Sequence, residues 1–333
     1  MKPLIGITLG DPAGIGPEIV LKALAERRVQ ETLVPLLFGD RVVIEEAMAQ
    51  TGLVRPLRRL HKPAENGAAG DELPYFDTGS LEGPVEMGRV DGSCGRAAFA
   101  AIRTAIEWAR AGWIDALATA PINKASLQQG GVPFIDHSAM LAALTESPKA
   151  MTLFVVGRLR IFFLTKHIPL GRVSAALTIP GVVEGLVESD RGLQQLRLPR
   201  RRIALAALNP HASDGGLFGD EEMRILAPAV EEACSLGLEV CGPVPADSVF
   251  HQCSQGEYDA VLSLYHDQGH IAAKTLDFHR TVSFTLGLPF LRTTPDHGTA
   301  FAIAGTNQAN PLSMIEALLA AAEYCRRRGQ NIS

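Results

Sequence analysis

Hydrophobic and polar positions divide this chain into two kinds of block. Short apolar runs bounded by glycine or polar residues predict buried strands, and longer stretches with apolar residues every three or four positions predict helices packed on a core. The expected strands are residues 4–9, a strand that ends at residues 39–40, and residues 116–119, 151–156, 161–164, 203–208, 260–264 and 282–285. The expected helices are residues 17–27, 40–49, 96–110, 180–195 and 311–325. Such alternation is typical of an α/β fold with a parallel sheet.

Three of the predicted strands are followed by a histidine. His266 follows residues 260–264, His167 follows residues 161–164, and His211 follows residues 203–208. Ligands of open α/β sheets bind just outside the carboxyl ends of the strands, so three histidines delivered there predict a divalent-metal site. The alternative is that each is an ordinary hydrogen-bonded loop residue.

A glycine-rich segment, residues 10–18, joins the first strand to the first helix. Pro17 suits the first helical position, and three glycines allow backbone N–H groups to approach a ligand. A Rossmann dinucleotide site is an alternative, with the acid supplied by Asp40, although the glycine spacing is not G-x-G-x-x-G. Asp40 is otherwise expected to cap a helix that Gly52 closes.

Composition favours a two-domain enzyme. The chain has 333 residues, 47% of them hydrophobic and 6% aromatic, which fits an α/β protein of two domains better than a β-sandwich. Lysine and arginine number 31 against 36 acids, so no footprint for nucleic acid or an anionic membrane is expected. No apolar stretch has the length of a membrane span. Five cysteines without a C-x-x-C pair predict reduced thiols in the cytoplasm.

Several segments together resemble the 4-hydroxythreonine-4-phosphate dehydrogenase family. They are residues 10–18, Ala-Pro-Ile-Asn-Lys at 120–124, Asn-Pro-His at 209–211, Tyr-His-Asp-Gln-Gly at 265–269, and residues 285–293. The resemblance implies an oxidoreductase of pyridoxine biosynthesis, a homodimer with a shared active site. It also implies two α/β/α domains like those of isocitrate and isopropylmalate dehydrogenases, with a cleft between them. Residues 1–125 plus 287–333 would be the nicotinamide-cofactor side, and residues 126–286 the metal, substrate and dimerisation domain.

The resemblance also implies roles for individual residues. The metal, which would be zinc, magnesium, manganese or cobalt, would bind to His167, His211 and His266. The phosphorylated substrate would contact His137, Ser138, Lys274, Ser283 and Arg292. Asp247, Asp267 and Lys274 are the catalytic candidates, with loop capping or surface ion pairing as the alternative roles. The metal would lower the pKa of the substrate hydroxyl while hydride passes to NAD or NADP, and the β-keto acid would then lose carbon dioxide.

The segment from His297 to Gly305 resembles the adenosine-binding loop of β-decarboxylating dehydrogenases. The resemblance assigns cofactor binding to Gly298, Ala302 and Asn310. An acid at position 302 would favour NAD and a base would favour NADP, and alanine does neither. Weak discrimination with a preference for NAD is therefore expected. The alternative is that this loop merely joins a strand to the last helix.

The substrate is the most open expectation. The family's His-Thr-Glu is His137-Ser138-Ala139 here, and an asparagine usual in its pocket is Ser283, which removes hydrogen-bonding positions. Candidate substrates are 4-hydroxythreonine 4-phosphate and D-threonate or D-erythronate 4-phosphate. The alternatives are a cis-dihydrodiol dicarboxylate of aromatic catabolism, or a metal-binding protein on the same scaffold that is not a dehydrogenase.

Overall fold

The computed structural model describes residues 2–62, 71–81 and 83–329, and the chain divides into two units. Unit 1 is Met1–Ala150 with Leu288–Ser333, and unit 2 is Met151–Gly287. The sequence placed residues 126–150 with the second domain, whereas the structure places them in unit 1. The reason is packing, because Leu127, Met140 and Leu141 share a buried cluster with Ile102 of unit 1.

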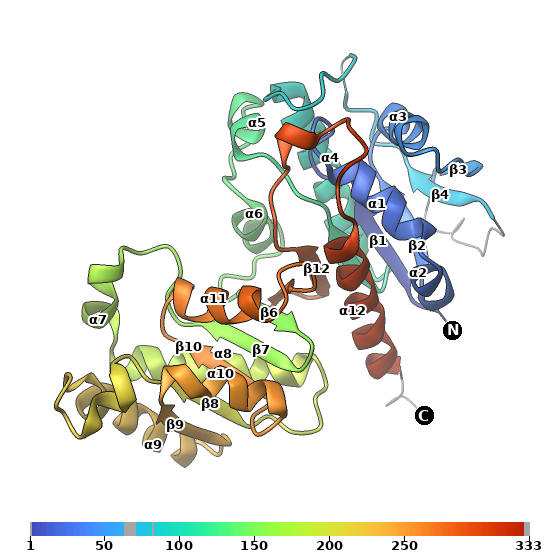
Figure 1. Cartoon of the computed structure of the whole chain (residues 1–333). Helices are drawn as coiled ribbons and strands as arrows, with labels where there is room; N and C mark the ends of the chain where they lie inside the picture. The colour runs from blue at the N-terminus through green and yellow to red at the C-terminus, as the bar shows by residue number, and fades with distance from the viewer. Residues whose placement is uncertain (1, 63–70, 82, 330–333) are drawn as a thin grey trace. The chain divides into compact units, whose positions relative to one another are not determined.

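The sheet of unit 1 is entirely parallel, with strand order β3-β4-β2-β1-β5-β12 (Figure 1). Its strands are β1 (Leu4–Thr8), β2 (Val34–Phe38), β3 (Leu57–Leu60), β4 (Leu73–Phe76), β5 (Ala116–Thr119) and β12 (Leu291–Pro295). Every residue of β5 is buried, as expected for a central parallel strand covered on both faces. Because all six strands run the same way, their carboxyl ends lie along one edge.

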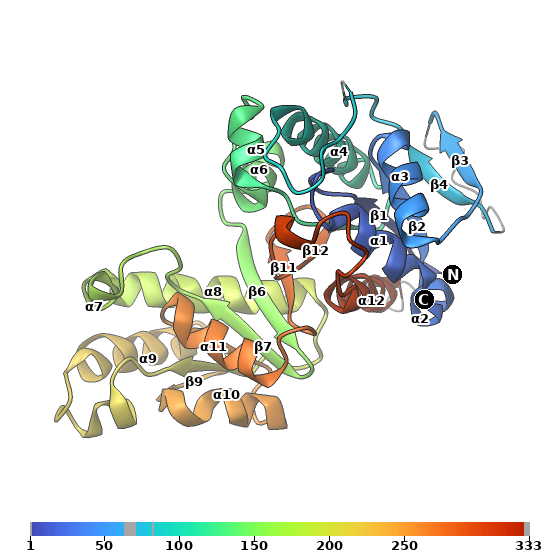
Figure 2. The same cartoon turned by 45° about the horizontal axis from the view of Figure 1, so that its top comes forward.

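Helices cover both faces of this sheet (Figure 2). Alternate strand residues separate the two layers: Ile5 and Ile7 pack with one set of helices, and Phe38 and Leu117 pack with the other. The first set is α1 (Gly16–Ala25), α2 (Arg27–Thr32), α3 (Arg41–Thr51) and α12 (Leu312–Gly329). The second set is α4 (Gly92–Arg110), α5 (Lys124–Gln129) and α6 (His137–Leu144).

The sheet of unit 2 is mixed, with strand order β11-β6-β7-β10-β8-β9. Its strands are β6 (Met151–Val156), β7 (Leu159–Phe163), β8 (Ile203–Ala206), β9 (Val240–Val244), β10 (Ala260–Ser263) and β11 (Val282–Leu286). β6 pairs antiparallel with β7 and with β11, and the hairpin turns at Gly157, whose φ is 57°. β7, β10, β8 and β9 are parallel neighbours, so the segments that carry the three histidines leave the same edge.

Helices also cover both faces of this second sheet. Val261 and Ile161 pack with α10 (Ala246–Gln255) and α11 (His266–Leu276). The residues that alternate with them, Leu262 and Phe162, face α8 (Ile179–Gln195), which also packs on α9 (Ala227–Ser235). Shorter helical segments are η2 (Leu170–Arg172), α7 (Val173–Ala176), η3 (Pro210–Asp214), η4 (Glu222–Leu226) and, in unit 1, η5 (Phe301–Ile303). The predicted α/β fold with two α/β/α domains is confirmed.

Among the described residues, no single helix has the length and apolar character to cross a membrane. One bent pair, Leu170–Ala176 with Ile179–Gln195, passes the length and composition test when its two halves are taken together. The second half of this pair is α8, which buries Leu186 and Leu193 in unit 2.

Candidate active site

The glycine-rich segment is a packed corner at the carboxyl end of β1. A Cβ atom on Gly16 would lie 2.2 Å from the carbonyl oxygen of Leu9, so only glycine fits there. Asp11 is buried and accepts a hydrogen bond from the Ala13 amide (2.9 Å), and burial raises the pKa of its carboxyl group. The Ile15 amide donates to the carbonyl of Thr299 (3.0 Å). The amides of Ala13 and Ile15 in this segment are therefore bonded to groups of the protein itself.

The arrangement around Asp40 does not support the Rossmann alternative. Its carboxylate accepts from the amides of Ser80 (2.5 Å) and Leu81 (3.2 Å) and from the Thr78 hydroxyl (3.2 Å). The side chain therefore holds residues 78–81 and is not directed to a ribose. The sequence predicted that Asp40 caps α3. Asp40 does hold the N-cap position, but its side chain makes no capping hydrogen bond to the helix. Gly52 ends the helix in the left-handed conformation, as expected.

A buried arginine of unit 1 directs its side chain toward the carboxyl end of the neighbouring strand β5. Arg292 of β12 is 3% exposed, and its Nε and Nη2 atoms donate to the Thr119 hydroxyl at the end of β5 (3.1 and 2.6 Å). Burial lowers the pKa of Arg292 to about 9, which still leaves the guanidinium charged at neutral pH. A buried planar cation of this kind suits a phosphate or carboxylate group.

His137 lies beside this arginine at the start of α6. Its Nε2 atom is buried and has no hydrogen-bond partner. Burial and the neighbouring Arg292 charge hold the pKa of His137 well below its ordinary value, so the ring is neutral. Asp136 caps α6 by accepting a hydrogen bond from the Ala139 amide (2.9 Å). Its charge raises the pKa of Arg292 and so partly offsets the lowering caused by burial. A buried orphan nitrogen next to a buried cation is the arrangement expected where an anion belongs.

The other expected substrate residues differ in exposure. Ser138, next to His137, is exposed. Ser283 is buried in the middle of β11. Lys274 lies in the last turn of α11, with its Nζ atom 5.2 Å from the centre of the Phe278 ring. Ser138 belongs to unit 1, and Ser283 and Lys274 belong to unit 2.

Of the three candidate metal ligands, His266 has a ring that is oriented by a neighbouring carboxylate. It is the first residue of α11, and its Nδ1 atom lies 2.6 Å from the Asp267 carboxylate. A carboxylate oxygen only accepts, so Nδ1 carries the proton and Nε2 keeps its lone pair for a metal. The His270 ring stacks on it at 3.6 Å, and His270 Nδ1 donates to the His266 carbonyl (2.8 Å). Asp267 therefore fixes the orientation of the His266 ring.

The rest of the His-Asp-Gln-Gly motif is structural. Gln268 accepts from the Leu264 amide (2.7 Å) and donates to the Ala207 carbonyl (2.8 Å), so it ties the ends of β10 and β8 together. A Cβ atom on Gly269 would lie 2.6 Å from Phe163 Cε1 and 2.7 Å from Ile161 Cγ2. Glycine is required there because α11 crosses β7 at close range.

The structure brings two of the three histidines together. The rings of His167 and His266 have their centres 5.9 Å apart. His211 is exposed on η3, where its φ of 54° is left-handed, and its ring neighbours Phe218 at 6.4 Å. Across residues 2–62, 71–81 and 83–329, no three His, Cys, Asp or Glu side chains are close enough to hold a metal ion.

Two carboxylates near this edge have different surroundings. Asp247 is exposed in the first turn of α10, a helix that packs against η3. Glu222 is 3% exposed and was missed by the sequence analysis. It accepts from the amides of Leu208 (2.8 Å) and Asn209 (2.7 Å) and from the Asn209 side chain (2.8 Å). Glu222 therefore fixes the loop that carries His211. Nothing in the sequence around Glu222 indicates this role, which follows from its burial and hydrogen bonds in the structure.

The expected cofactor residues lie on one loop of unit 1. Gly298, Ala302 and Asn310 are all exposed. The Asn310 side-chain oxygen accepts from the Leu312 amide (3.0 Å), so it caps α12 and leaves its amide NH₂ group for a ligand. An exposed loop at the carboxyl edge of a parallel sheet fits a nucleotide.

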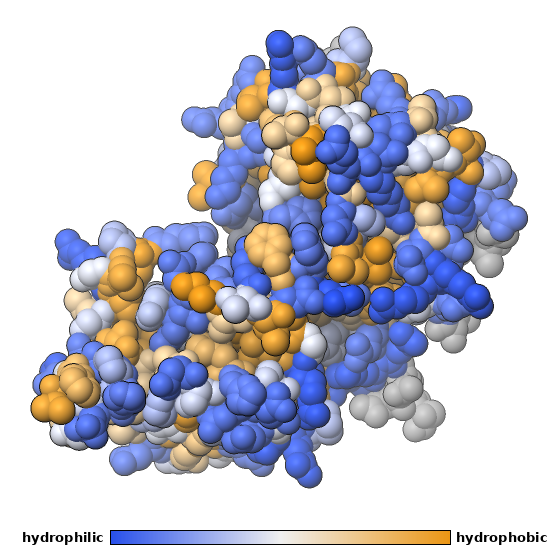
Figure 3. Space-filling model, in the orientation of Figure 1, coloured by the Kyte–Doolittle hydropathy of each residue, from blue (hydrophilic) through white to orange (hydrophobic). Residues whose placement is uncertain are grey.

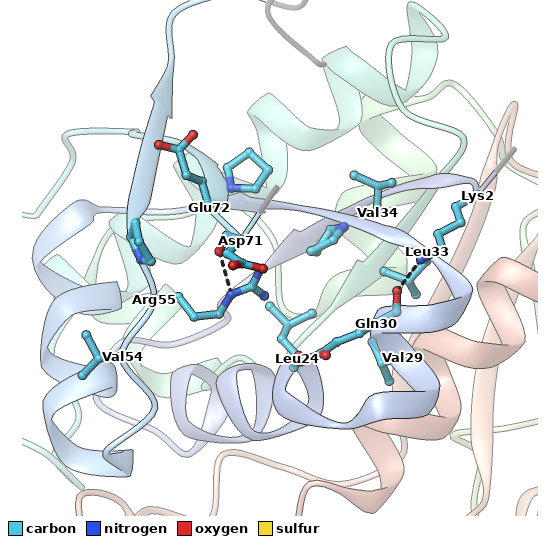
Figure 4. A pocket seen from close by; sticks show the side chains of 13 residues that line it. Lys2, Leu24, Val29, Gln30, Leu33, Val34, Val54, Arg55, Asp71 and Glu72 are labelled. Atoms are coloured by element: carbon cyan, nitrogen blue, oxygen red, sulfur yellow. Dashed lines mark hydrogen bonds between the residues drawn. The ribbon is translucent and has the colours of Figure 1, made fainter. Parts of the chain in front are cut away.

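A pocket of about 630 Å³ lies elsewhere in unit 1 (Figure 4). Its lining includes Lys2, Val34, Pro56 and Glu72, which stand at the amino ends of β1 to β4. Arg55 crosses it to donate to the Asp71 carbonyl (3.1 and 3.0 Å). None of the predicted site residues lines this pocket, which is at the opposite edge of the sheet from Arg292.

Two α/β units, with a buried arginine in one and a carboxylate-supported histidine after a strand in the other, are compatible with an enzyme whose ligands bind at strand ends. Residues 31–321 match the family described as "Pyridoxal phosphate biosynthetic protein PdxA". The chain belongs to this family, and it is an oxidoreductase.

Relatives are similar over almost the whole chain. Proteins of Clostridium botulinum (46% identical) and Symbiobacterium thermophilum (48% identical), both named "Putative D-threonate 4-phosphate dehydrogenase", are covered over 97% of each chain. The structure resembles 4-hydroxythreonine-4-phosphate dehydrogenase from Klebsiella pneumoniae, with a TM-score of 0.88 and 39% identity over 97% of this chain and 100% of that one. It also resembles terephthalate 1,2-cis-dihydrodiol dehydrogenase from Burkholderia xenovorans, with a TM-score of 0.65 and 28% identity over 97% and 99%. Membership of a dehydrogenase family implies a nicotinamide cofactor.

Proposed function

We propose that this protein oxidises and decarboxylates a four-carbon, 4-phosphorylated hydroxy acid. D-Threonate 4-phosphate is the first choice, followed by D-erythronate 4-phosphate and 4-hydroxythreonine 4-phosphate. The observation that carries the proposal is the buried Arg292 beside the orphan Nε2 atom of His137, which suits a phosphate. The names of the relatives from Clostridium and Symbiobacterium favour the D-threonate compound.

In the proposed reaction, hydride leaves the carbon that bears the hydroxyl and passes to the nicotinamide ring of NAD or NADP. The hydroxyl proton goes to a carboxylate, for which the exposed Asp247 is the candidate. The β-keto acid then loses carbon dioxide, and the enolate takes a proton, for which Lys274 is the candidate donor. Arg292, His137 and Ser138 hold the phosphate, and the small Ser283 leaves space for the substrate.

A divalent metal (zinc, magnesium, manganese or cobalt) would supply Lewis-acid stabilisation of the developing negative charge. His266 fits such an ion because Asp267 fixes its tautomer and leaves Nε2 available. The described part of one chain contains no group of three ligands. We therefore propose that the set is completed in a homodimer, with His211 and His266 coming from different subunits.

The surface of unit 2 supports a homodimer. Seven large apolar side chains there are more than half exposed: Leu170, Leu217, Met223, Leu236, Ile271, Leu276 and Phe278. Figure 3 shows apolar side chains at the surface of unit 2 around α7 and α11. Leu217 and Ile271 flank the segments that carry His211 and His266, so a partner bound here would lie near both. The five free thiols fit a cytoplasmic enzyme.

The test is a comparison of kcat/KM by reduction of NAD for D-threonate 4-phosphate, 4-hydroxythreonine 4-phosphate and an unphosphorylated cis-dihydrodiol dicarboxylate. The proposal expects the phosphorylated acids to react, with D-threonate 4-phosphate best. Removing the phosphate should cost roughly 100-fold or more, because a buried cation would be left without its anion. Turnover of the dihydrodiol alone would refute the assignment of Arg292.

A further inference from the structure

Helix α1 holds the second half of the exposed loop that carries Ala302. Glu18 is 1% exposed, and its Oε1 atom accepts from the Ala309 amide (2.8 Å) and from Lys22 Nζ (2.7 Å). Lys22 Nζ also donates to the carbonyls of Asn307 (2.9 Å) and Ala309 (3.1 Å). The three donors of the ammonium group are thus used on one carboxylate and two loop carbonyls.

This ion pair supplies hydrogen bonds to backbone groups of the loop that are not bonded within a helix or strand. Gly305 and Asn307 have φ values of 80° and 59°, so residues 305–309 belong neither to a helix nor to a strand. Gln50 of α3 donates to the other oxygen of Glu18 (3.1 Å), which fixes the carboxylate from a third direction. Glu18 is buried and Lys22 is partly exposed, and breaking their ion pair would leave the buried carboxylate without its cation, so the pair favours one geometry.

The first half of the loop is held by the other end of the glycine-rich segment. The Ile15 amide donates to the Thr299 carbonyl (3.0 Å), and a Cβ atom on Gly14 would lie 2.9 Å from Thr299 Cβ. Thr299 and Ala309 are the buried points of the loop, and Ala302 between them is exposed. The glycine-rich segment and α1 therefore form a support with two attachment points.

We propose that Glu18 and Lys22 are positioning residues that hold residues 299–309 in the conformation that binds the nicotinamide cofactor. The inference rests on the proposed function, in which this loop receives the adenosine end. It gives residues 10–18 a different task from the phosphate cradle of a Rossmann site: the segment acts through the cofactor loop and does not touch the cofactor. A loop released from its support would bind weakly, because only the ordered fraction is competent.

The test uses the full-length protein with Lys22→Met, Lys22→Arg and Glu18→Gln. The matched control is Arg27→Met, which removes a neighbouring exposed ion pair with Glu31 that makes no loop contact. Hydrogen exchange of residues 305–310 is measured without cofactor. The Kd of NAD is measured by calorimetry, and KM and kcat are measured for NAD and for the phosphorylated substrate.

Lys22→Met should speed exchange of the Ala309 amide and raise both Kd and KM for NAD roughly tenfold, the effect of losing a charge-assisted hydrogen bond. Glu18→Gln, which keeps an acceptor for Ala309, should show a smaller rise of the same kind. The kcat at saturating NAD and the KM of the phosphorylated substrate should stay within about twofold of wild type. Lys22→Arg should restore most of the affinity.

Three results would overturn the inference: unchanged exchange at 305–310, an unchanged Kd for NAD, or a uniform loss of every parameter together with a lowered Tm. The variant Ala302→Asp separates this failure from that of the proposed function. If Ala302→Asp changes the NAD to NADP ratio but Lys22→Met leaves the Kd unchanged, only the positioning role is wrong. If Ala302→Asp changes nothing, the loop is not the cofactor loop.

Discussion

The carboxyl edges of the two sheets differ in how complete they are. In unit 1, Arg292 is 3% exposed, is bonded to Thr119 and lies beside a neutral His137, so both groups of the proposed anion site come from one unit. In unit 2, His211 is exposed, and His167 and His266 lie without a third ligand among the described residues. Under the proposed function, phosphate recognition would be prepared within one chain, whereas the proposed metal site would take a ligand from a second.

The largest expected effect is at the incomplete edge. His211→Asn should remove metal, measured by mass spectrometry, and lower kcat by more than about 100-fold, since even residues that support a ligand contribute 10 to 100-fold. Asparagine is chosen because it tolerates the left-handed φ of 54° at this position. The Tm should change little because the side chain is exposed. His279→Asn, at another exposed histidine of unit 2, is the control, and a fully metallated, active His211→Asn would reject the ligand role.

At the edge of unit 1, Arg292→Met should lower kcat/KM for the phosphorylated substrate by roughly 100-fold, because one partner of a buried charge pair is lost. Metal content should be unchanged. Arg280→Met removes an exposed arginine and should be silent. An equal loss with an unphosphorylated analogue would show that Arg292 does not recognise phosphate.

A smaller effect is expected at the cofactor loop. Ala302→Asp should shift the preference toward NAD by about tenfold, because a carboxylate accepts from the ribose 2′-hydroxyl and repels a 2′-phosphate. Steady-state kinetics with both cofactors measure this ratio, and Ala302→Asn is the uncharged control. A constant ratio would mean that position 302 does not face the ribose.

The smallest effect concerns the pH dependence of stability. The pKa of His137 is lowered in the folded protein, so the unfolded chain binds a proton that the folded one does not. Stability from this group is present above the unfolded pKa of about 6.5 and is lost as the pH falls below it. Between pH 7.5 and 5.5 the wild type should lose up to about 1.4 kcal/mol more than His137→Gln. Urea unfolding at both pH values measures the difference, and His279→Gln is the control. Equal losses in wild type and His137→Gln would show that the ring is not held neutral.

Much of the fold follows from local pattern. β5 occupies the predicted residues 116–119, and Gly52 ends α3 as expected. β9 and β12 were not predicted, because Pro243 interrupts the apolar run of one and three polar residues lie in the other. Both segments form strands because they pair with neighbouring strands of the sheet, β9 with β8 and β12 with β5. The domain boundary was misplaced because α5 and α6 join unit 1 by tertiary packing, which no local signal records.

The sequence drew attention to candidate site residues where a rare residue type follows a recognisable strand. The three histidines after predicted strands are of this kind, whereas Arg292 was named only through the family resemblance, because its strand β12 was not predicted. No local pattern indicated the roles of Glu222, Gln268 and the pair of Glu18 and Lys22, because each of them binds backbone groups far away along the chain. Asp40 was misjudged for the same reason, since its partners are the amides of Ser80 and Leu81.

The most direct test of the contrast between the two edges is complementation in mixed dimers. Inactive His211→Asn and His266→Ala proteins are unfolded together, refolded at equal amounts and assayed for metal and activity. If His211 and His266 of different subunits form one site, half of the dimers are mixed and each mixed dimer has one intact site, so about a quarter of wild-type activity returns. Recovery of no activity and no metal, with mixed dimers shown to form, would contradict a site shared between subunits.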